Sequence, residues 1–259
     1  MKTAKSTMKR TRHVLPLPSG ESLVFDWTPP GSTGRTAVFV HGLGSNRRGD
    51  KAEHFAERFA DLGWGFLALD LRGHGESGGG MEQLTLSRCL EDLHAVLAWL
   101  PDPRSVGLMI GSSMGGAVTA WYQARHPAAG RCIALIAPAF RFPARFAELP
   151  AAEMAEWRRS GVRRFLSEWI DLKIGYSLVE DSTQYTFDEL LRTYAAPTLI
   201  LHGMQDVAVP WQDSVSFIER AACPNIHLLL IKEGDHRLTR QKAYLFDSMT
   251  DWLREHGIF

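Results

Sequence analysis

The sequence predicts an α/β fold built on a doubly wound, mostly parallel sheet with a small inserted cap. Short apolar runs alternate with helical patterns along most of the 259 residues, and most of these runs end at a glycine-containing turn. Runs that are apolar along their whole length are typical of parallel strands covered on both faces. Right-handed crossovers then place helices on both faces of the sheet. A single long break in the alternation predicts the cap.

The predicted elements follow the chain. Strands are expected at residues 37–40, 64–69, 106–110, 132–136, 197–201 and 226–231, and helices at residues 51–62, 84–100 and 114–126. The aromatic- and charge-rich stretch at residues 140–195 is too long for a bare loop in a compact domain. We therefore expect a body of residues 1–139 and 196–259 and an inserted cap subdomain at residues 140–195. Within this cap, a helix is expected at residues 153–164 and a strand or hairpin at residues 172–185.

The composition excludes several classes of protein. The 29 Lys+Arg balance the 29 Asp+Glu, and a net charge of zero argues against nucleic-acid binding, which needs a basic face. The three cysteines are too far apart for a disulfide framework or a metal motif. The basic N-terminus has no apolar stretch behind it, as a secretory signal would, and no apolar run approaches the roughly 18 residues of a membrane span. These features predict a cytoplasmic protein without a membrane span, and the alternative for the basic N-terminus is a mitochondrial presequence.

A nucleophile is predicted at residues 111–115 (GSSMG), a G-x-S-x-G motif. An apolar strand runs into the motif and a helix runs out of it, which is the context that a nucleophile elbow requires. The turn would present the Ser113 hydroxyl above the sheet, at the positive end of the helix dipole. The alternative is a Gly/Ser helix cap that carries no chemistry.

A serine hydroxyl needs a base to take its proton and an acid to orient that base. Asp206 follows the strand at residues 197–201 and His236 follows the strand at residues 226–231, so both lie with Ser113 at the carboxyl ends of the strands. Asp70 and Asp181 are earlier acids that could replace Asp206. The other histidines fit this order and position less well, and Asp235 is expected to shape the turn before His236.

Two backbone N–H groups are expected to hold the oxyanion that forms during acyl transfer. One is the N–H of Met114, directly after the nucleophile. The other is the N–H of Leu43, in the loop His41-Gly42-Leu43-Gly44 after the first central strand. The alternative for this loop is an ordinary glycine turn.

Five motifs in order resemble the α/β-hydrolase superfamily across nearly the whole chain. They are His41-Gly42-x-Gly44, Asp70-x-Arg72-Gly73-His74-Gly75-x-Ser77, Gly111-x-Ser113-x-Gly115, His202-Gly203-x-x-Asp206 and Gly234-Asp235-His236. In detail the chain looks like bacterial serine hydrolases related to the mitochondrial acyl-protein thioesterase that also cleaves acyl glucuronides. The resemblance implies an α/β-hydrolase fold, a triad of Ser113, Asp206 and His236, and ester or thioester hydrolysis without a cofactor. No H-E-x-x-H or comparable metal-ligand spacing occurs, so no metal is expected.

The predicted function is hydrolysis of carboxylic esters, with thioesters as a second option, of short to medium acyl or aryl-acyl groups. The expected partner is a small-molecule ester, and the protein is expected to be a monomer or homodimer. Alternatives are a non-catalytic small-molecule binder, a serine peptidase and an acyltransferase. The expected substrate-binding residues are His41, Gly42, Arg47, Phe140 and Trp211. Arg47 belongs to a candidate basic rim for anionic substrates, and Phe140 to a group of cap aromatics that includes Phe142, Phe146, Trp157 and Trp169.

Overall fold

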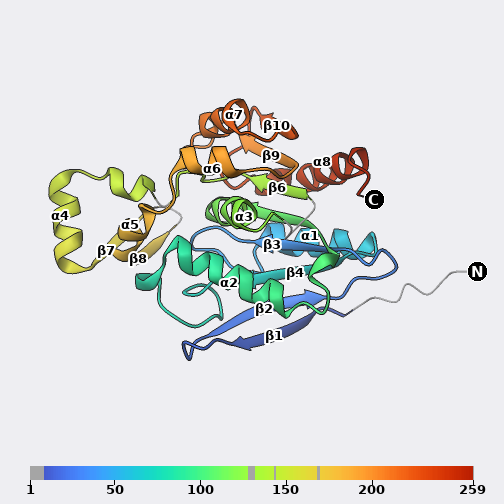
Figure 1. Ribbon diagram of the computed structural model, residues 1–259, viewed down its shortest axis with the longest axis horizontal. Coiled ribbons are helices and arrows are strands. Elements are labelled where there is room, and N and C mark those ends of the chain that lie inside the picture. Colours follow the sequence, from blue (N-terminus) through green and yellow to red (C-terminus); the bar gives the residue numbers. More distant parts are fainter. Residues whose placement is uncertain (1–8, 128–131, 143, 168–169, 259) are drawn as a thin grey trace, which may run out of the picture.

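The structure, a computed structural model, describes residues 9–127, 132–142, 144–167 and 170–258. The strands of the main sheet are β1 (Thr11–Pro16), β2 (Ser22–Thr28), β3 (Thr36–Val40), β4 (Gly65–Asp70), β5 (Val106–Ser112), β6 (Cys132–Ile136), β9 (Thr198–Gly203) and β10 (Ile226–Ile231). They form one eight-stranded sheet in the order β1-β2-β4-β3-β5-β6-β9-β10 (Figure 1). β2 is antiparallel to both β1 and β4, and all other neighbouring strands are parallel. This confirms the predicted mostly parallel sheet.

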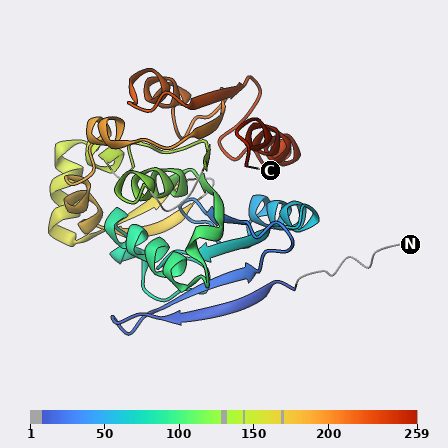
Figure 2. The ribbon, with the colours of Figure 1, turned by 45° about the vertical axis from the view of Figure 1, so that its right-hand side comes forward.

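Helices cover both faces of the sheet, which confirms the doubly wound arrangement. α1 (Asp50–Asp61) and α8 (Lys242–Glu255) pack on one face, and α2 (Leu86–Trp99), α3 (Met114–Arg125) and α7 (Trp211–Arg220) on the other (Figure 2). The side chains of β3 show why the strand is apolar throughout: Val38 and Val40 enter the core under α2 and α3, whereas Phe39 enters the core under α1 and α8. α7 and α8 have no counterpart among the predicted helices.

The antiparallel hairpin of β1 and β2 was also missed. The side chains of β1 alternate between exposed and half-buried, so the strand lacks the continuous apolar run by which the parallel strands are identified. β2 is mostly buried, but Asp26 interrupts its apolar residues. The hairpin extends the sheet beyond β4 and brings Asp26 into the molecule.

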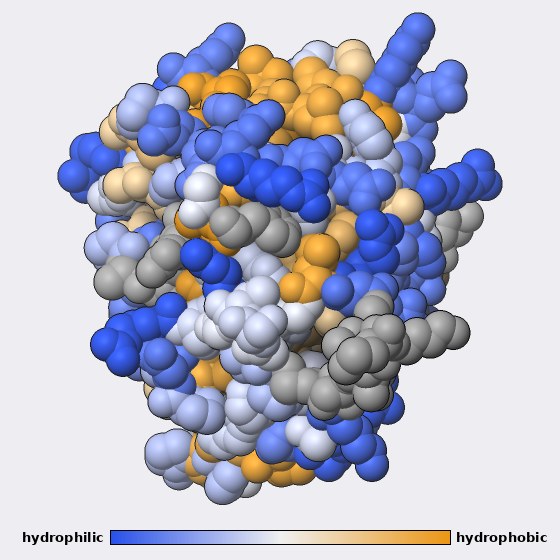
Figure 3. Space-filling view, turned by 90° about the vertical axis from the view of Figure 1, so that its right-hand side faces the viewer, coloured by the Kyte–Doolittle hydropathy of each residue, from blue (hydrophilic) through white to orange (hydrophobic). Residues whose placement is uncertain are grey.

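The two edge strands of the sheet differ in their polarity. β1 carries Arg12, which pairs with Glu76, and it ends at Pro16. β10 has no charged residue, and Leu228 to Ile231 are only half-buried. Charges and proline on an edge strand oppose pairing with another chain, so β10 is the less protected edge. Figure 3 shows the side of the molecule that lies on the right in Figure 1. Hydrophobic side chains gather near the top of this view, at the height at which Figure 1 shows β10. The oligomeric state stays a prediction.

The segment between β6 and β9 carries its own small elements. Figure 1 shows α4 and the β7–β8 pair beyond one end of the main sheet, on the left of the view. The elements are η3 (Ala144–Glu148), α4 (Ala151–Ser160), β7 (Val162–Leu166), β8 (Asp171–Gly175), α5 (Ser177–Ser182) and α6 (Phe187–Thr193). β7 and β8 form a separate antiparallel pair. The division into a body and a cap at residues 140–195 stays a prediction.

Two expectations for this segment are corrected. The predicted helix at residues 153–164 ends at Ser160, because Gly161 adopts a positive φ of 75° and caps it, after which β7 begins. The predicted strand or hairpin at residues 172–185 is strand only as far as Gly175. Its remainder includes α5, which starts at Ser177.

Among the residues that the structure describes, no helix is long and apolar enough to cross a membrane.

The start of α3 lies in direct contact with β3. A Cβ atom at Gly115 would lie 2.2 Å from the carbonyl oxygen of Val40 and 2.4 Å from that of His41. These are backbone atoms of a central strand and its loop, so they cannot move aside as a flexible side chain would. Glycine at this position is therefore required for the helix to begin where it does.

We expect Gly115→Ala to lower the free energy of unfolding by about 3 kcal/mol, the upper part of the range for overpacked sites. Urea denaturation followed by circular dichroism measures this. Gly80→Ala is the matched control, because its added Cβ would meet only the end of the flexible Glu82 side chain and φ at Gly80 is −115°. Its expected change is within about 0.5 kcal/mol. Equal stability of the two variants would contradict the crowding of α3 against β3.

Candidate active site

Ser113 occupies the sharp turn between β5 and α3. Its backbone has φ 55° and ψ −118°, a conformation that costs a non-glycine residue about 1–3 kcal/mol. Two hydrogen bonds hold it there: its N–H donates to the carbonyl of Ile136 at 2.9 Å, and its carbonyl accepts from the N–H of Ala139 at 3.0 Å. The turn is thus fixed by the strand end of β6, and Ser113 lies at the position predicted for a nucleophile elbow.

The Ser113 side chain is the first member of a hydrogen-bonded chain. Its Oγ lies 3.0 Å from Nε2 of His236, and Nδ1 of His236 lies 2.7 Å from Oδ2 of Asp206. The structure thus brings together the three residues that the sequence analysis selected. The rival acids are engaged elsewhere, Asp70 by Arg47 and Asp181 by Ser87.

Asp206 and His236 meet because the loops after β9 and β10 touch. A Cβ atom at Gly203 would lie 2.2 Å from the carbonyl oxygen of Gly234. The N–H of Gln205 donates to that same carbonyl at 2.9 Å. Both glycines were identified in the sequence only as motif positions. Their close approach places the acid-bearing loop against the histidine-bearing loop.

The carboxylate of Asp206 accepts four hydrogen bonds. Oδ1 accepts from the backbone N–H groups of Ala208 and Val209, at 2.9 and 2.8 Å. Oδ2 accepts from the rings of His236 and His202, at 2.7 and 3.1 Å. Burial alone would raise the pKa of Asp206, but these hydrogen bonds outweigh it and hold the pKa well below its ordinary value. Asp206 is therefore an anion throughout the physiological pH range.

The loop of residues 41–44 lies against Ser113. A Cβ atom at Gly42 would lie 3.1 Å from Cβ of Ser113 and 3.6 Å from its Oγ. The carbonyl of Gly42 accepts hydrogen bonds from Nδ1 of His41 at 2.8 Å and from the N–H of Ser45 at 3.1 Å. In a planar trans peptide the N–H points away from the carbonyl. Holding the carbonyl of Gly42 therefore also fixes the direction of the Leu43 N–H.

The second predicted donor is the N–H of Met114. Met114 is the first residue of α3, where a backbone N–H has no acceptor within the helix. Its position next to Ser113 agrees with the expected role, and the two oxyanion donors stay a prediction.

His41 is buried, with 1% of its surface exposed, which makes it a support of the loop rather than a substrate contact. Its Nε2 accepts a hydrogen bond from the N–H of Leu71 at 3.1 Å, so the proton of the neutral ring lies on Nδ1, facing Gly42. Burial, and then the neighbouring His74, lower the pKa of His41 to about 3. The ring is therefore neutral in the folded protein.

The expectation that Arg47 binds substrate is contradicted. Arg47 is 2% exposed, and its guanidinium pairs with Asp70, Asp26 and Glu76. The half-exposed Arg48 also pairs with Asp26, at 2.9 Å. Neither residue is an unpaired cation on a rim. Arg47 instead ties the loop after β3 to β2 and to the loop after β4.

Phe140 is likewise part of the core. It is 1% exposed, and its ring stacks on that of Phe217 in α7, with centroids 4.1 Å apart and planes 3° apart. This packing contradicts the expected substrate contact. Phe142 and Trp157 are also buried. Trp211 begins α7 and is half-buried, and its role stays a prediction, whereas Trp169 lies outside the described residues.

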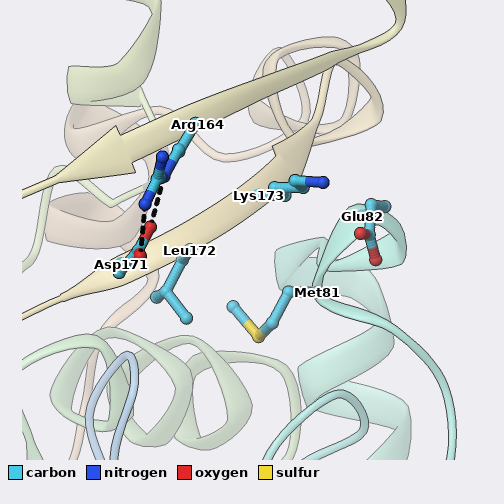
Figure 4. Close-up of a pocket in the computed structure, with 6 residues that line it drawn as sticks. All are labelled: Met81, Glu82, Arg164, Asp171, Leu172 and Lys173. Carbon is cyan, nitrogen blue, oxygen red and sulfur yellow. Dashed lines mark hydrogen bonds and ion pairs between the residues drawn. The ribbon is translucent and has the colours of Figure 1, made fainter.

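An open pocket with a volume of about 420 Å³ lies between η1 (Met81–Gln83) and the β7–β8 pair (Figure 4). Leu172 of β8 lines it and also faces the loop of residues 41–44, because its Cδ1 lies 3.5 Å from the place of a Cβ at Gly44. Through Leu172, one wall of this pocket therefore reaches the loop that contacts Ser113. Its lining combines apolar Met81 and Leu172 with charged Glu82, Arg164, Asp171 and Lys173, of which Arg164 and Asp171 form an ion pair.

One residue of the site, His202, was not expected to have a role of its own. It stands in the sequence only as a motif position, yet it contacts Asp206 directly. The signal that could have found it is its place in the H-G-x-x-D motif, four residues before the acid. Within the described parts of the chain, no group of three or more His, Cys, Asp or Glu side chains is arranged to hold a metal ion.

Comparisons with known proteins identify a family and several relatives. The family described as serine aminopeptidase, S33 matches residues 31–193. The chain is 29% identical over 215 residues to mouse palmitoyl-protein thioesterase ABHD10, mitochondrial, which covers 80% of this chain and 70% of that relative. It is 25% identical over 290 residues to a monoacylglycerol lipase of Mycolicibacterium smegmatis, with 95% and 98% covered.

Solved structures show the same fold. Alpha/beta hydrolase domain-containing protein 10 from mouse aligns with a TM-score of 0.82 and 24% identity over 95% of this chain and 99% of that chain. Est1E from Butyrivibrio proteoclasticus, solved with ferulic acid bound, aligns with a TM-score of 0.73 and 22% identity over 93% and 99%. The predicted α/β-hydrolase fold is thus confirmed.

We expect Arg47→Ala to lower the free energy of unfolding by about 3–5 kcal/mol, because it leaves the buried carboxylate of Asp70 without its cation. Arg48→Ala is the control, since its side chain is 53% exposed and its expected cost is about 0–1 kcal/mol. Urea denaturation gives both values. KM for neutral and anionic esters should change alike in both variants. A stable Arg47→Ala protein with KM raised only for anionic esters would restore the substrate-binding role.

The low pKa of His41 predicts a pH dependence of stability. The unfolded chain binds a proton at His41 below about pH 6.5, whereas the folded protein does so only near pH 3, so stability is complete above pH 6.5 and falls as the pH decreases. At pH 5 the loss amounts to about 2 kcal/mol. Urea denaturation at pH 7.5, 6 and 5 should show a smaller loss for His41→Asn than for the wild type. Identical losses would show that His41 is not the residue responsible.

Proposed function

Because the chain belongs to the serine aminopeptidase S33 family of α/β hydrolases, we propose that it cleaves carboxylic esters through an acyl-enzyme on Ser113. The observation that carries the proposal is the hydrogen-bonded chain from Ser113 through His236 to Asp206, with distances of 3.0 and 2.7 Å. This order of nucleophile, base and orienting acid is the one that activates a serine hydroxyl.

In the first step, Ser113 Oγ attacks the ester carbonyl while Nε2 of His236 takes the hydroxyl proton. Asp206 holds the opposite ring nitrogen and stabilises the imidazolium that forms. The N–H groups of Leu43 and Met114 hold the oxyanion, a contribution of about 2.7–4 kcal/mol for each donor. His236 then gives the proton to the leaving alcohol, which departs and leaves an acyl ester on Ser113.

In the second step, His236 takes a proton from water, and the resulting hydroxide attacks the acyl ester. The second oxyanion collapses, the carboxylic acid leaves, and Ser113 recovers its proton from His236. Both steps use the same donors and the same base, and neither requires a cofactor.

The substrate proposal rests on the open pocket that Leu172 connects to the loop of residues 41–44. Met81 and Leu172 give it an apolar part, which suits a short to medium acyl or aryl-acyl group. The charged side chains on its lining suit a polar group at the far end of the substrate. Thioesters are the second candidate, because the mouse relative is named a thioesterase and the same two steps cleave a thioester.

We expect Ser113→Ala to lower kcat for p-nitrophenyl esters by at least about 10³-fold with the fold intact, since a triad without its nucleophile loses most of its rate. Ser112→Ala is the matched control and should retain activity. A fluorophosphonate probe should label the wild type and the Ser112 variant but not the Ser113 variant, which mass spectrometry checks. A folded wild type that stays unlabelled would indicate a non-catalytic binder.

The same assay defines the substrate range. We expect turnover of p-nitrophenyl esters to be highest for short to medium acyl chains. Thioester turnover would support the second candidate, and turnover of amides alone would replace the ester proposal by a peptidase.

A further inference from the structure

A buried histidine extends the chain of hydrogen bonds beyond Asp206. His202 is the fifth residue of β9, and none of its surface is exposed. Its Nε2 lies 3.1 Å from Oδ2 of Asp206 and 3.2 Å from the carbonyl oxygen of Val209. Its Nδ1 lies 2.7 Å from Oγ of Ser214 in α7, which is also fully buried. Both ring nitrogens therefore have partners within the protein.

These partners assign the ring proton. Nε2 faces a carboxylate and a carbonyl, which are both acceptors, so Nε2 carries the proton. Ser214 can then donate its hydroxyl proton to Nδ1. In the opposite tautomer Nε2 would carry no proton. It would then face two acceptors in a buried place without donating to either, which is costly. The two acceptors at Nε2 therefore set the tautomer in which His202 donates to Asp206, and Ser214 satisfies the other ring nitrogen.

Two imidazole rings thus donate to one oxygen atom. Oδ2 of Asp206 accepts from His236 at 2.7 Å and from His202 at 3.1 Å. The backbone N–H groups of Ala208 and Val209 hold only Oδ1. With Oδ1 alone held, the carboxylate could pivot about that atom and shift Oδ2. The donor from His202 opposes this pivot and so determines where Oδ2 meets His236.

We propose that His202 and Ser214 are positioning residues of the active site, which fix the Asp206 oxygen that orients His236. The inference rests on the proposed function. Two hydrogen-bonded series meet at Asp206. One runs from Ser214 in α7 through His202, and the other runs from Ser113, in the turn before α3, through His236. Neither His202 nor Ser214 contacts the substrate, because both are fully buried.

The proposal predicts a specific kinetic change. His202→Leu removes the ring N–H that donates to Asp206 and fills the buried position with an apolar side chain. Asp206 should then orient His236 less well. We expect kcat to fall by about 10–100-fold, the usual effect of losing an outer partner that orients a site residue. KM should stay within about two-fold, because no substrate contact is lost. His202→Gln should restore most of kcat, since its amide can donate from nearly the place of Nε2.

A second variant removes the hydrogen bond at the other ring nitrogen of His202. Ser214→Ala removes the hydroxyl that faces Nδ1 and leaves the ring in place. We expect a smaller fall in kcat of about 5-fold, the loss expected for one neutral hydrogen bond, with KM unchanged. Tyr194→Phe is the control, because it removes a buried hydroxyl that contacts Thr198 at the other end of β9 and touches no residue of the site. This control should lose thermal stability and keep kcat.

The experiment measures kcat, KM, the melting temperature and the rate of fluorophosphonate labelling for each variant. Labelling reports the activation of Ser113 without the deacylation step, so its rate should fall in parallel with kcat. A folded His202→Leu protein with wild-type kcat and labelling rate would overturn the inference, as would a loss that His202→Gln does not restore. If His202→Leu does not fold, Ser214→Ala decides: wild-type kcat in this variant overturns the inference, and the expected fall supports it. Failure of the proposed function is distinct, because the wild type itself would then remain unlabelled.

Discussion

The close packing of α3 against β3 and β5 is the constraint on which the rest of the site depends. Because Gly115 lies against the backbone of Val40 and His41, the helix can begin directly beside the central strands. Ser113 must then adopt a strained turn, which hydrogen bonds to the end of β6 and the residues after it hold in place. The same contact brings the loop after β3 against Ser113. One backbone approach therefore sets the positions of the nucleophile and of the neighbouring loop together.

Much of this arrangement could be predicted from the sequence, because it depends on local patterns. The central strands are apolar on both faces, so their approximate positions can be identified without knowledge of their neighbours. Ser113, Asp206 and His236 each follow such a strand, and the ends of parallel strands meet at one edge of a sheet. Their proximity follows from that rule. The rule does not explain the additional contact between Gly203 and Gly234 that brings the two loops together.

The errors have a common physical cause, which is that burial by distant partners leaves no local signal. Arg47 has the pattern of a loop residue near a rim, but Asp26 comes from β2, a strand that the apolar pattern did not reveal. Phe140 has the pattern of a cap aromatic, yet it stacks on Phe217 from α7, also unidentified. His202 lies only four residues before Asp206, but its second side-chain partner, Ser214, becomes its neighbour only when α7 folds back on β9.

The order of strands in the sheet shows which elements between β6 and β9 the fold needs and which it does not. β6 and β9 are parallel neighbours, so the chain must return from the end of one to the start of the other. α6 makes this return, packed in the same apolar core as α3. The elements from η3 to α5 form a detour before that return, and the pairing of the strands does not depend on them. The length and sequence of this detour over the Gly44 loop can therefore change without disturbing the turn at Ser113 or the loops after β9 and β10.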